Sequence, residues 1–210
     1  MKLSIFGSTG RTGLQLVSQA LEQGHEVTAH ARSPEKIDQE HEKLQVVEGD
    51  VMDFASVERA IQGQDAVLCS LGIPNIMDKS RLRANGTKNI VRAMEKTGIK
   101  RFICQSSLGA GDSRELLPFH YKYLIAPLFM RYLYSDHNMQ ENYIRKSPLD
   151  WIIVRPGVLT DAKLTGSYKH GFAANDKTVT HKISRADVAD FMLRQLAEDT
   201  YLHQTPCISY

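Results

Sequence analysis

Gly7-Ser8-Thr9-Gly10-Arg11-Thr12-Gly13 is the most informative stretch of the 210-residue chain. It follows the apolar run 3–6 and leads into a helical pattern over 12–23, so the glycines occupy a strand–turn–helix unit. Gly7 permits a tight turn, Gly10 lets a pyrophosphate approach the backbone, and Gly13 lets helix and strand pack closely. The helix N-terminus adds free N–H groups and partial positive charge. We therefore expect a dinucleotide here, in contact with Gly7, Thr9, Gly10, Arg11, Thr12 and Gly13.

The rest of the chain alternates short apolar runs with helical patterns, which is typical of βαβ units and a parallel sheet. The runs that we expect as strands are 3–6, 26–31, 44–47, 65–71, 101–105 and 150–154, with Ile208 in a last edge strand. The expected helices are 12–23, with Leu14, Val17 and Leu21 on one face, then 54–62, 81–97 and 184–196. Ser184 and Asp187 form a capping-box-like start to the last helix. The prediction is a single domain, 1–210, with a doubly wound, mostly parallel α/β sheet (a Rossmann fold).

Composition is that of an ordinary soluble globular protein. The chain is 42% hydrophobic and 24% charged with a net charge of +2, and its basic residues are scattered, so nothing favours nucleic acid as a partner. No apolar stretch reaches about 18 residues and no signal-peptide pattern is present, so we expect no membrane partner. Cys69, Cys104 and Cys207 are odd in number and widely spaced, which indicates neither a disulfide framework nor a metal site. A reducing cytoplasm is the expected location.

The end of the second expected strand indicates which cofactor binds. An NAD-binding fold usually carries Asp or Glu there to bond the ribose 2′-hydroxyl, whereas this chain has His30-Ala31-Arg32-Ser33. Arg32 can bond a 2′-phosphate through its planar fork, Ser33 can add a hydroxyl, and Arg11 is a second candidate. We therefore expect NADP(H), against the alternative that Arg32 is a solvated surface residue.

Three further segments are expected along the cofactor. Asp50 and Val51 would flank the adenine, although Asp50 could equally be a turn aspartate. Leu71 and Gly72 end the fourth strand where the chain would pass the ribose. Pro156, Gly157 and Val158 follow the sixth strand and complete the expected cofactor set together with Ser106.

The segment 108–134 lies between the fifth and sixth expected strands and is rich in Leu, Phe, Tyr and Met. It follows the carboxyl end of a strand, where open α/β sheets bind ligands. Three interpretations stay open: an extra helix packed on the sheet edge, a lid or substrate wall, and a dimer contact. The substrate-wall interpretation relies on the aromatic stretch 119–134, with Phe119 and Tyr123 as its contact residues.

Taken together, these residues resemble the atypical short-chain dehydrogenase/reductase superfamily, closest to the flavin reductase/biliverdin reductase B group, with NmrA-like proteins more distant. The pieces that carry the resemblance are 7–13, Arg32, 49–51, 63–67, 89–91, 155–157, 164–168 and 191–194. The resemblance implies reduction of flavins and open-chain tetrapyrroles by NADPH. It also implies that Ser106 is the active-site serine, which could orient the substrate or hold a water, against the alternative of a strand-end serine bonding its own turn.

Departures from that family are informative. No tyrosine is followed four residues later by lysine, so the proton-donating Tyr-x-x-x-Lys pair of ordinary short-chain dehydrogenases is missing. Leu133 and His137 take those two places, and His137 is a candidate general acid or else a solvated helix histidine. Val158 stands where the flavin-reductase group often has histidine, which disfavours tetrapyrroles relative to flavins. Arg155 is expected to be structural.

The leading hypothesis is an NADPH-dependent reductase that transfers hydride to a flavin or similar planar conjugated acceptor, such as a quinone or tetrapyrrole. The alternative is a non-catalytic NADP(H)-sensing regulator of the NmrA kind, which the missing Tyr/Lys pair favours. A sugar-nucleotide epimerase would need the missing tyrosine. The expected partner is a small molecule, and the expected state is a monomer or weak homodimer.

Overall fold

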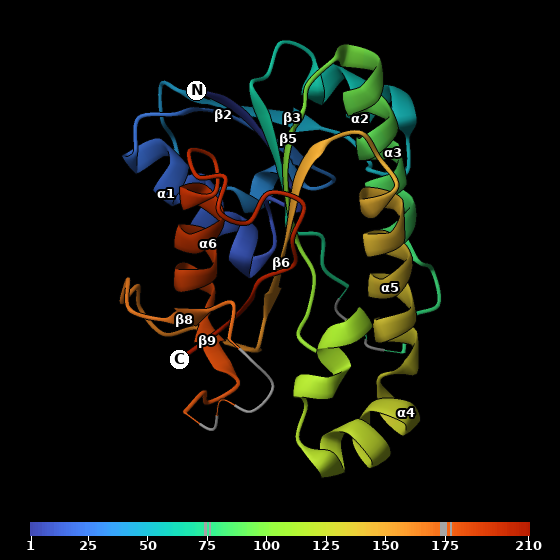
Figure 1. Cartoon of the computed structure of the whole chain (residues 1–210). Helices are drawn as coiled ribbons and strands as arrows, with labels where there is room; N and C mark the ends of the chain where they lie inside the picture. The colour runs from blue at the N-terminus through green and yellow to red at the C-terminus, as the bar shows by residue number, and fades with distance from the viewer. Residues whose placement is uncertain (74, 76, 173–175, 177) are drawn as a thin grey trace.

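The computed structural model describes residues 1–73, 75, 77–172, 176 and 178–210. Its main sheet has eight strands in the order β3-β2-β1-β4-β5-β6-β10-β8 (Figure 1). Seven of them are parallel: Lys2–Phe6 (β1), Glu26–Ala31 (β2), Leu44–Glu48 (β3), Ala66–Cys69 (β4), Arg101–Gln105 (β5), Asp150–Pro156 (β6) and Cys207–Ser209 (β10). The predicted doubly wound, mostly parallel sheet is confirmed.

The far edge of the sheet differs from the prediction. Lys169–His170 (β8) pairs antiparallel with β10, so Ile208 lies in a penultimate strand and its assignment to the edge strand is wrong. Two-residue β8 carries too little apolar pattern to be recognised from sequence. Val158–Thr160 (β7) and Lys182–Ser184 (β9) form a separate two-stranded parallel sheet that was also not predicted.

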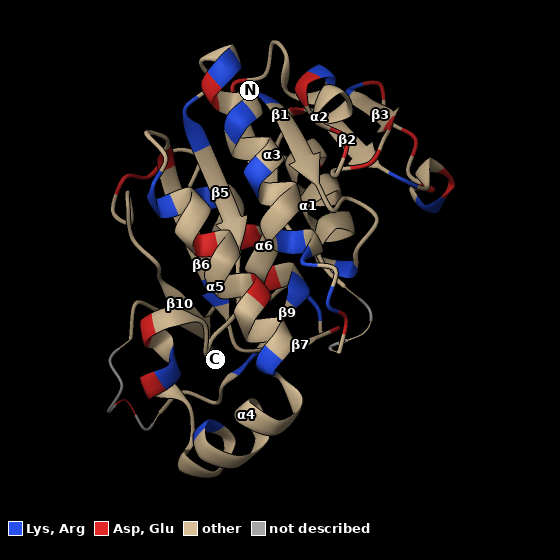
Figure 2. Cartoon of the chain, turned by 90° about the vertical axis from the view of Figure 1, so that its right-hand side faces the viewer, with Lys and Arg blue, Asp and Glu red and all other residues tan. Residues whose placement is uncertain are grey.

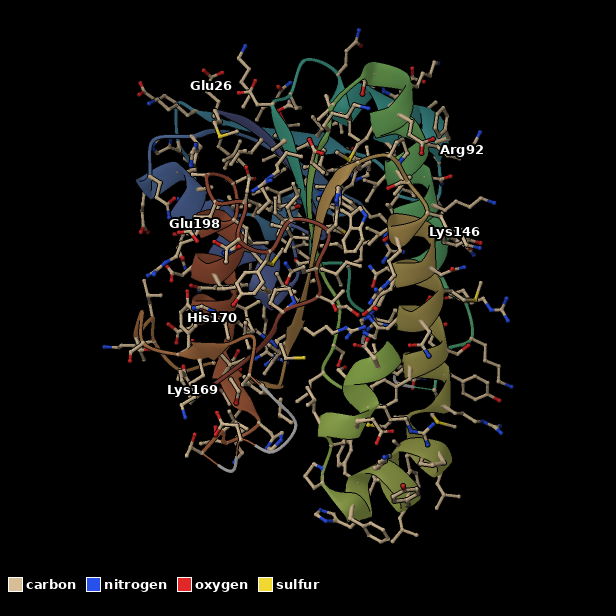
Figure 3. The ribbon with its side chains drawn as sticks, viewed as in Figure 1. Glu26, Arg92, Lys146, Lys169, His170 and Glu198 are labelled. Atoms are coloured by element: carbon tan, nitrogen blue, oxygen red, sulfur yellow. The ribbon has the colours of Figure 1, made fainter. Side chains whose placement is uncertain are left out.

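Helices cover both faces of the sheet (Figure 1). Arg11–Glu22 (α1) and Arg185–Arg194 (α6) pack together on one face, while Phe54–Ile61 (α2), Leu82–Thr97 (α3) and Arg131–Arg145 (α5) cover the other. Each layer has its own apolar core. The outer sides of the helices are charged, as the exposed Arg92 and Lys146 illustrate in Figure 3. None of the described helices is long and apolar enough to cross a membrane.

The buried face of α1 agrees with the predicted one at Val17 and Leu21 and differs at Leu14. Leu14 is 36% exposed, whereas Leu16, Val17 and Ala20 are buried. The cause is Gly13, where a Cβ would lie only 2.0 Å from the carbonyl oxygen of Gly7. A helix rotated so that position 13 touches the strand turns its next residue, about 100° further round, toward solvent.

The predicted start of α6 is confirmed. Ser184 is the N-cap, and its hydroxyl accepts a hydrogen bond of 2.9 Å from the Asp187 amide. The Asp187 carboxylate also accepts bonds from the Thr165 amide at 2.9 Å and the Tyr210 hydroxyl at 2.5 Å. Asp187 therefore ties a loop and the last residue of the chain to the beginning of α6.

The segment 108–134 forms three short helical pieces before α5. They are a 3-10 helix, Gly111–Leu116 (η2), a π-helical turn, Tyr121–Ile125 (η3), and Ala126–Phe129 (α4). The last two project beyond the carboxyl ends of the central strands (Figure 1). Figure 2 shows that the α4 region carries few charged residues compared with the rest of the chain.

Candidate functional site

A cavity of about 840 Å³ opens at the carboxyl ends of the parallel strands. It runs from the ends of β1 and β2 past β4 and β5 to α5 and the segment 117–134. Open α/β sheets bind ligands at this edge. Most of the predicted site residues lie in its wall: Gly7, Thr9, Gly10, Arg11, Thr12, Arg32, Val51, Leu71, Gly72, Ser106, His137, Pro156, Gly157 and Val158.

The glycine turn presents donors to this cavity. The amides of Arg11, Thr12 and Gly13, at the start of α1, make no hydrogen bond within the described part of the chain. No acidic residue lies in the first turn of α1. Of these, Arg11 and Thr12 line the cavity, and their free N–H groups at the positive end of a 12-residue helix form a site suited to phosphate.

Two of the glycines have different physical roles. A Cβ at Gly10 would meet only the Gly7 carbonyl oxygen, at 3.2 Å, so the space in front of the turn is open. A Cβ at Gly13 would overlap Gly7, so Gly13 serves the packing of helix on strand and lies outside the cavity wall.

Ser33 and Asp50 also lie outside the wall. Asp50 accepts a hydrogen bond of 2.9 Å from the Met52 amide, as a turn aspartate does. Ser33 precedes the 3-10 helix Pro34–Lys36 (η1), and its side chain makes no capping hydrogen bond.

Two positively charged side chains lie just after the end of β2. Arg32 and Lys36 are both exposed, both line the cavity, and neither forms an ion pair with an acidic group of the described residues. Arg11 differs, because its guanidinium binds Asp161 at 2.7 Å. Lys36 was not predicted. The signal that could have revealed it is its position in the single helical turn that follows Arg32.

At the opposite end of the cavity, a buried ion pair lies behind Ser106 and outside the cavity wall. The Ser106 hydroxyl donates to Glu141 Oε1 at 2.7 Å. Arg155 donates to the same oxygen from Nε at 2.9 Å and to Oε2 from Nη2 at 2.6 Å. Arg155 also reaches Asp112 at 2.8 Å. Arg155 and Glu141 are both almost fully buried, and a two-point contact of this kind holds a carboxylate in one orientation.

His137 lies beside Ser106 and is buried. Burial, reinforced by the nearby positive charge of Arg83, lowers the pKa of His137 to about 3. Its Nδ1 lies 3.1 Å from Gln140 Oε1 and 3.4 Å from Ser106 Oγ. Since Gln140 Nε2 donates to Thr87 at 3.0 Å, the amide oxygen of Gln140 faces the ring, and Nδ1 carries the proton of a neutral imidazole. A neutral ring of this kind is a poor proton donor near pH 7.

The apolar wall is made by other residues of the segment 108–134 than those predicted. Phe119 is 77% exposed and Tyr123 is 53% exposed, and neither lines the cavity, so their assignment as contact residues is wrong. The residues of the segment that line the cavity are Leu117, Pro118, Tyr121, Met130, Leu133 and Tyr134. The π-helical turn places Tyr121 inward and turns Tyr123 outward, where it packs on Phe119 with ring centroids 4.7 Å apart.

A phosphate-binding turn, free cations at β2 and one continuous cavity are features of a dinucleotide site. A family model described as "NAD(P)H-binding" matches residues 7–199 of the chain. The chain belongs to this NAD(P)H-binding family. The match confirms that the nicotinamide dinucleotide class expected from the glycine turn is the right one.

Some relatives of this NAD(P)H-binding protein match it over nearly its whole length. An uncharacterised chloroplastic protein of Arabidopsis thaliana is 32% identical over 94% of the chain and 72% of its own length. The oxidoreductase ylbE of Lactococcus lactis is 26% identical, with a TM-score of 0.83 over 100% of this chain and 90% of that one. The anaerobilin reductase ChuY of Escherichia coli O157:H7 is 24% identical, with a TM-score of 0.78 over 100% and 97%, and shows a common fold. The family match and these neighbours confirm the resemblance at the level of an NAD(P)H-binding, Rossmann-like family.

The state of His137 predicts how stability depends on pH. The folded protein holds His137 at a pKa of about 3, whereas the unfolded chain restores a value near 6.5, so protons bind preferentially to the unfolded state. This contribution to stability is complete above about pH 6.5 and is lost as the pH falls toward 3. Between about pH 7 and 5, wild type should lose about 2 kcal/mol more unfolding free energy than His137→Gln. Denaturant titrations at both pH values measure the difference, and parallel losses would contradict it.

Proposed function

We propose that this NAD(P)H-binding protein is an NADPH-dependent reductase that transfers hydride to a flavin or similar planar conjugated acceptor. The observation that carries the proposal is the continuity of one cavity. One end of this cavity has a helix N-terminus suited to phosphate and the side chains of Arg32 and Lys36, which form no ion pair among the described residues. The other end has an apolar wall opposite Ser106. The first end suits the phosphates of a dinucleotide and the second suits a flat apolar ring.

The chain offers groups that fit NADP(H). The free amides of Arg11 and Thr12 would hold the pyrophosphate, and Arg32 with Lys36 would hold the 2′-phosphate. Ser70 and Gln105 line the cavity, and their buried Oγ and Oε1 atoms have no hydrogen-bond partner among the described residues, as expected of groups that a bound ligand would satisfy. When bound, NADPH supplies the hydride, while the protein supplies position and surroundings.

The groups near Ser106 favour an acceptor that needs no strong protein acid. The Tyr-x-x-x-Lys pair is absent, and His137 is neutral. Hydride transfer to a flavin ring satisfies this condition, because the remaining proton can come from water. Catalysis would then consist mainly of proximity and orientation against the apolar wall. The fold shared with an anaerobilin reductase keeps anaerobilin among the acceptors to be tested.

We propose a small-molecule acceptor as the partner, neither nucleic acid nor membrane, and a monomer or weak homodimer with 108–134 as a substrate wall. The three cysteines are buried and unpaired, which supports a reducing compartment such as the cytoplasm.

A second candidate is a regulator of the NmrA kind that senses NADP(H) without turnover, and the missing Tyr/Lys pair favours it. Steady-state oxidation of NADPH, screened against FMN, riboflavin, quinones and biliverdin, separates the two. A reductase turns over at least one acceptor. A sensor binds oxidised and reduced cofactor equally well and turns over none.

The free cations predict cofactor preference. NADPH should bind at least about tenfold more tightly than NADH, because one charged hydrogen bond contributes roughly 1.5–3 kcal/mol. Arg32→Ala with Lys36→Ala should remove that preference and leave NADH affinity unchanged, while exposed Lys146→Ala serves as the control. Titration of both cofactors measures it, and tighter binding of NADH to wild type would contradict the expectation.

A further inference from the structure

Hydrogen-bond acceptors gather at the end of the cavity beside α5. Gln105 Oε1 is a buried oxygen with no partner among the described residues. His137 Nε2 carries the lone pair of a neutral ring and also has no hydrogen-bond partner within that part of the chain. Ser106 follows Gln105 in the sequence, and its Oγ lies 3.4 Å from His137 Nδ1. A ligand that fills this end must meet these atoms with donors of its own.

Glu141 and Arg155 determine whether the Ser106 hydroxyl donates or accepts hydrogen bonds in the cavity. A hydroxyl can donate one hydrogen bond, and that of Ser106 goes to Glu141 Oε1 at 2.7 Å. The same oxygen accepts from Arg155 Nε, so it carries no proton that it could donate to Ser106. Arg155 grips both carboxylate oxygens and prevents the carboxylate from turning. The Ser106 oxygen therefore has only lone pairs to offer to the cavity.

One cationic donor adjoins these acceptors. Arg83 lines the same end, and its Nη1 lies 3.4 Å from the Asp136 carboxylate, which leaves other guanidinium N–H groups available. Acceptor atoms beside a donor complement the edge of an amide, imide or lactam, in which an N–H adjoins a carbonyl oxygen.

We propose that the Glu141–Arg155 pair fixes Ser106 as a hydrogen-bond acceptor, and that Ser106 with Gln105 selects ligands presenting an amide-type N–H edge. Glu141 is thus a positioning residue, and Ser106 and Gln105 determine specificity. Two sources can supply this edge: a ring N–H of the acceptor, which rests on the proposed function, and the carboxamide of the cofactor, which does not.

Matched pairs of ligands test each source by equilibrium binding, without turnover. The acceptor pair is lumiflavin and 3-methyllumiflavin, titrated onto protein saturated with NADP+. The cofactor pair is NADP+ and its 3-acetylpyridine analogue, which replaces the amide by a methyl ketone. In at least one pair, the N–H ligand should bind wild type about tenfold or more tightly, equivalent to about 1.4 kcal/mol.

Variants test whether Ser106 and Gln105 cause the difference in affinity between the two ligands of a pair. Ser106→Ala and Gln105→Met should bring the affinity ratio toward one, while Ser147→Ala, whose hydroxyl bonds Ile144 at a helix end, keeps the wild-type ratio. Glu141→Met with Arg155→Met replaces the ion pair by apolar groups and frees the Ser106 hydroxyl, so the ratio should fall there too. A merely structural role would weaken both members of a pair equally.

Each outcome has a defined meaning. Discrimination within the flavin pair assigns the N–H to the acceptor and makes quinones, which lack an N–H, poorer substrates. Discrimination within the cofactor pair alone assigns the edge to the carboxamide. Equal affinities within both pairs, or ratios unchanged in folded Ser106→Ala and Gln105→Met, would overturn the inference. If no acceptor oxidises NADPH, the proposed function is wrong. The affinities of NADP+ and its 3-acetylpyridine analogue would still test the inference about Ser106 and Gln105.

Discussion

Gly10→Val should lower the affinity for NADP(H) at least about a hundredfold while leaving the fold intact. Gly10 is the N-cap of α1 with φ −74° and ψ 156°, a conformation in which a β-branched residue is comfortable. Its Cβ would lie 3.2 Å from the Gly7 carbonyl oxygen, a tight contact that a small shift relieves, and we expect its methyl groups to occupy the space in front of the free amides of Arg11 and Thr12. Loss of two charged hydrogen bonds, at roughly 1.5–3 kcal/mol each, produces the expected loss of affinity.

Gly13→Ala provides the contrast in the same turn. Its Cβ would lie 2.0 Å from the Gly7 carbonyl oxygen, so this smaller change should destabilise the fold itself. Thermal unfolding together with cofactor titration distinguishes the two variants. Unchanged NADPH affinity in folded Gly10→Val would show that the glycines serve only the turn.

Arg155→Met should lower the free energy of unfolding by about 3–5 kcal/mol, because among the described residues it leaves the buried Glu141 carboxylate with only the longer cationic contact of 3.5 Å to Arg145 Nη2. Arg155 is 1% exposed and Glu141 is 3% exposed, so water cannot replace the guanidinium without rearrangement. Replacing both residues by methionine removes the buried charge as well as its partner, and stability should recover most of the loss. Urea unfolding of the two variants measures this, and a loss below about 1 kcal/mol in Arg155→Met would contradict it.

Local signals predicted the framework of this protein. Glycine positions, apolar runs and a capping serine act over a few residues, so the turn at 7–13, the central strands and the start of α6 could all be recognised. The exposure of Leu14 could not, because Leu14 satisfies the same helical period as Val17 and Leu21, which are buried. The contact of Gly13 with Gly7 turns Leu14 out of the buried face.

The site was predictable where it follows the strand ends and unpredictable where α5 meets the sheet. Arg32 and Ser106 follow β2 and β5 directly, so the topology brings both to the cavity. Glu141 reaches Ser106 across 35 positions of sequence, and no local pattern marks that contact. In the segment 108–134, Pro118, Pro127 and a π-helical turn interrupt the regular helical period. The sequence pattern therefore could not show that Tyr121 lines the cavity while Tyr123 is exposed.

The central claim, that NADPH bound here passes its hydride to a planar acceptor, is tested most directly in a single turnover without oxygen. The protein is loaded with one equivalent of NADPH and mixed with FMN, and the nicotinamide and flavin absorbances are followed together. We predict equal, stoichiometric loss of reduced nicotinamide and oxidised flavin, faster than in a protein-free mixture, whereas Gly10→Val should be no faster than that mixture. Bound NADPH that persists unchanged beside FMN, riboflavin, quinones and biliverdin would contradict the account and favour the sensing role.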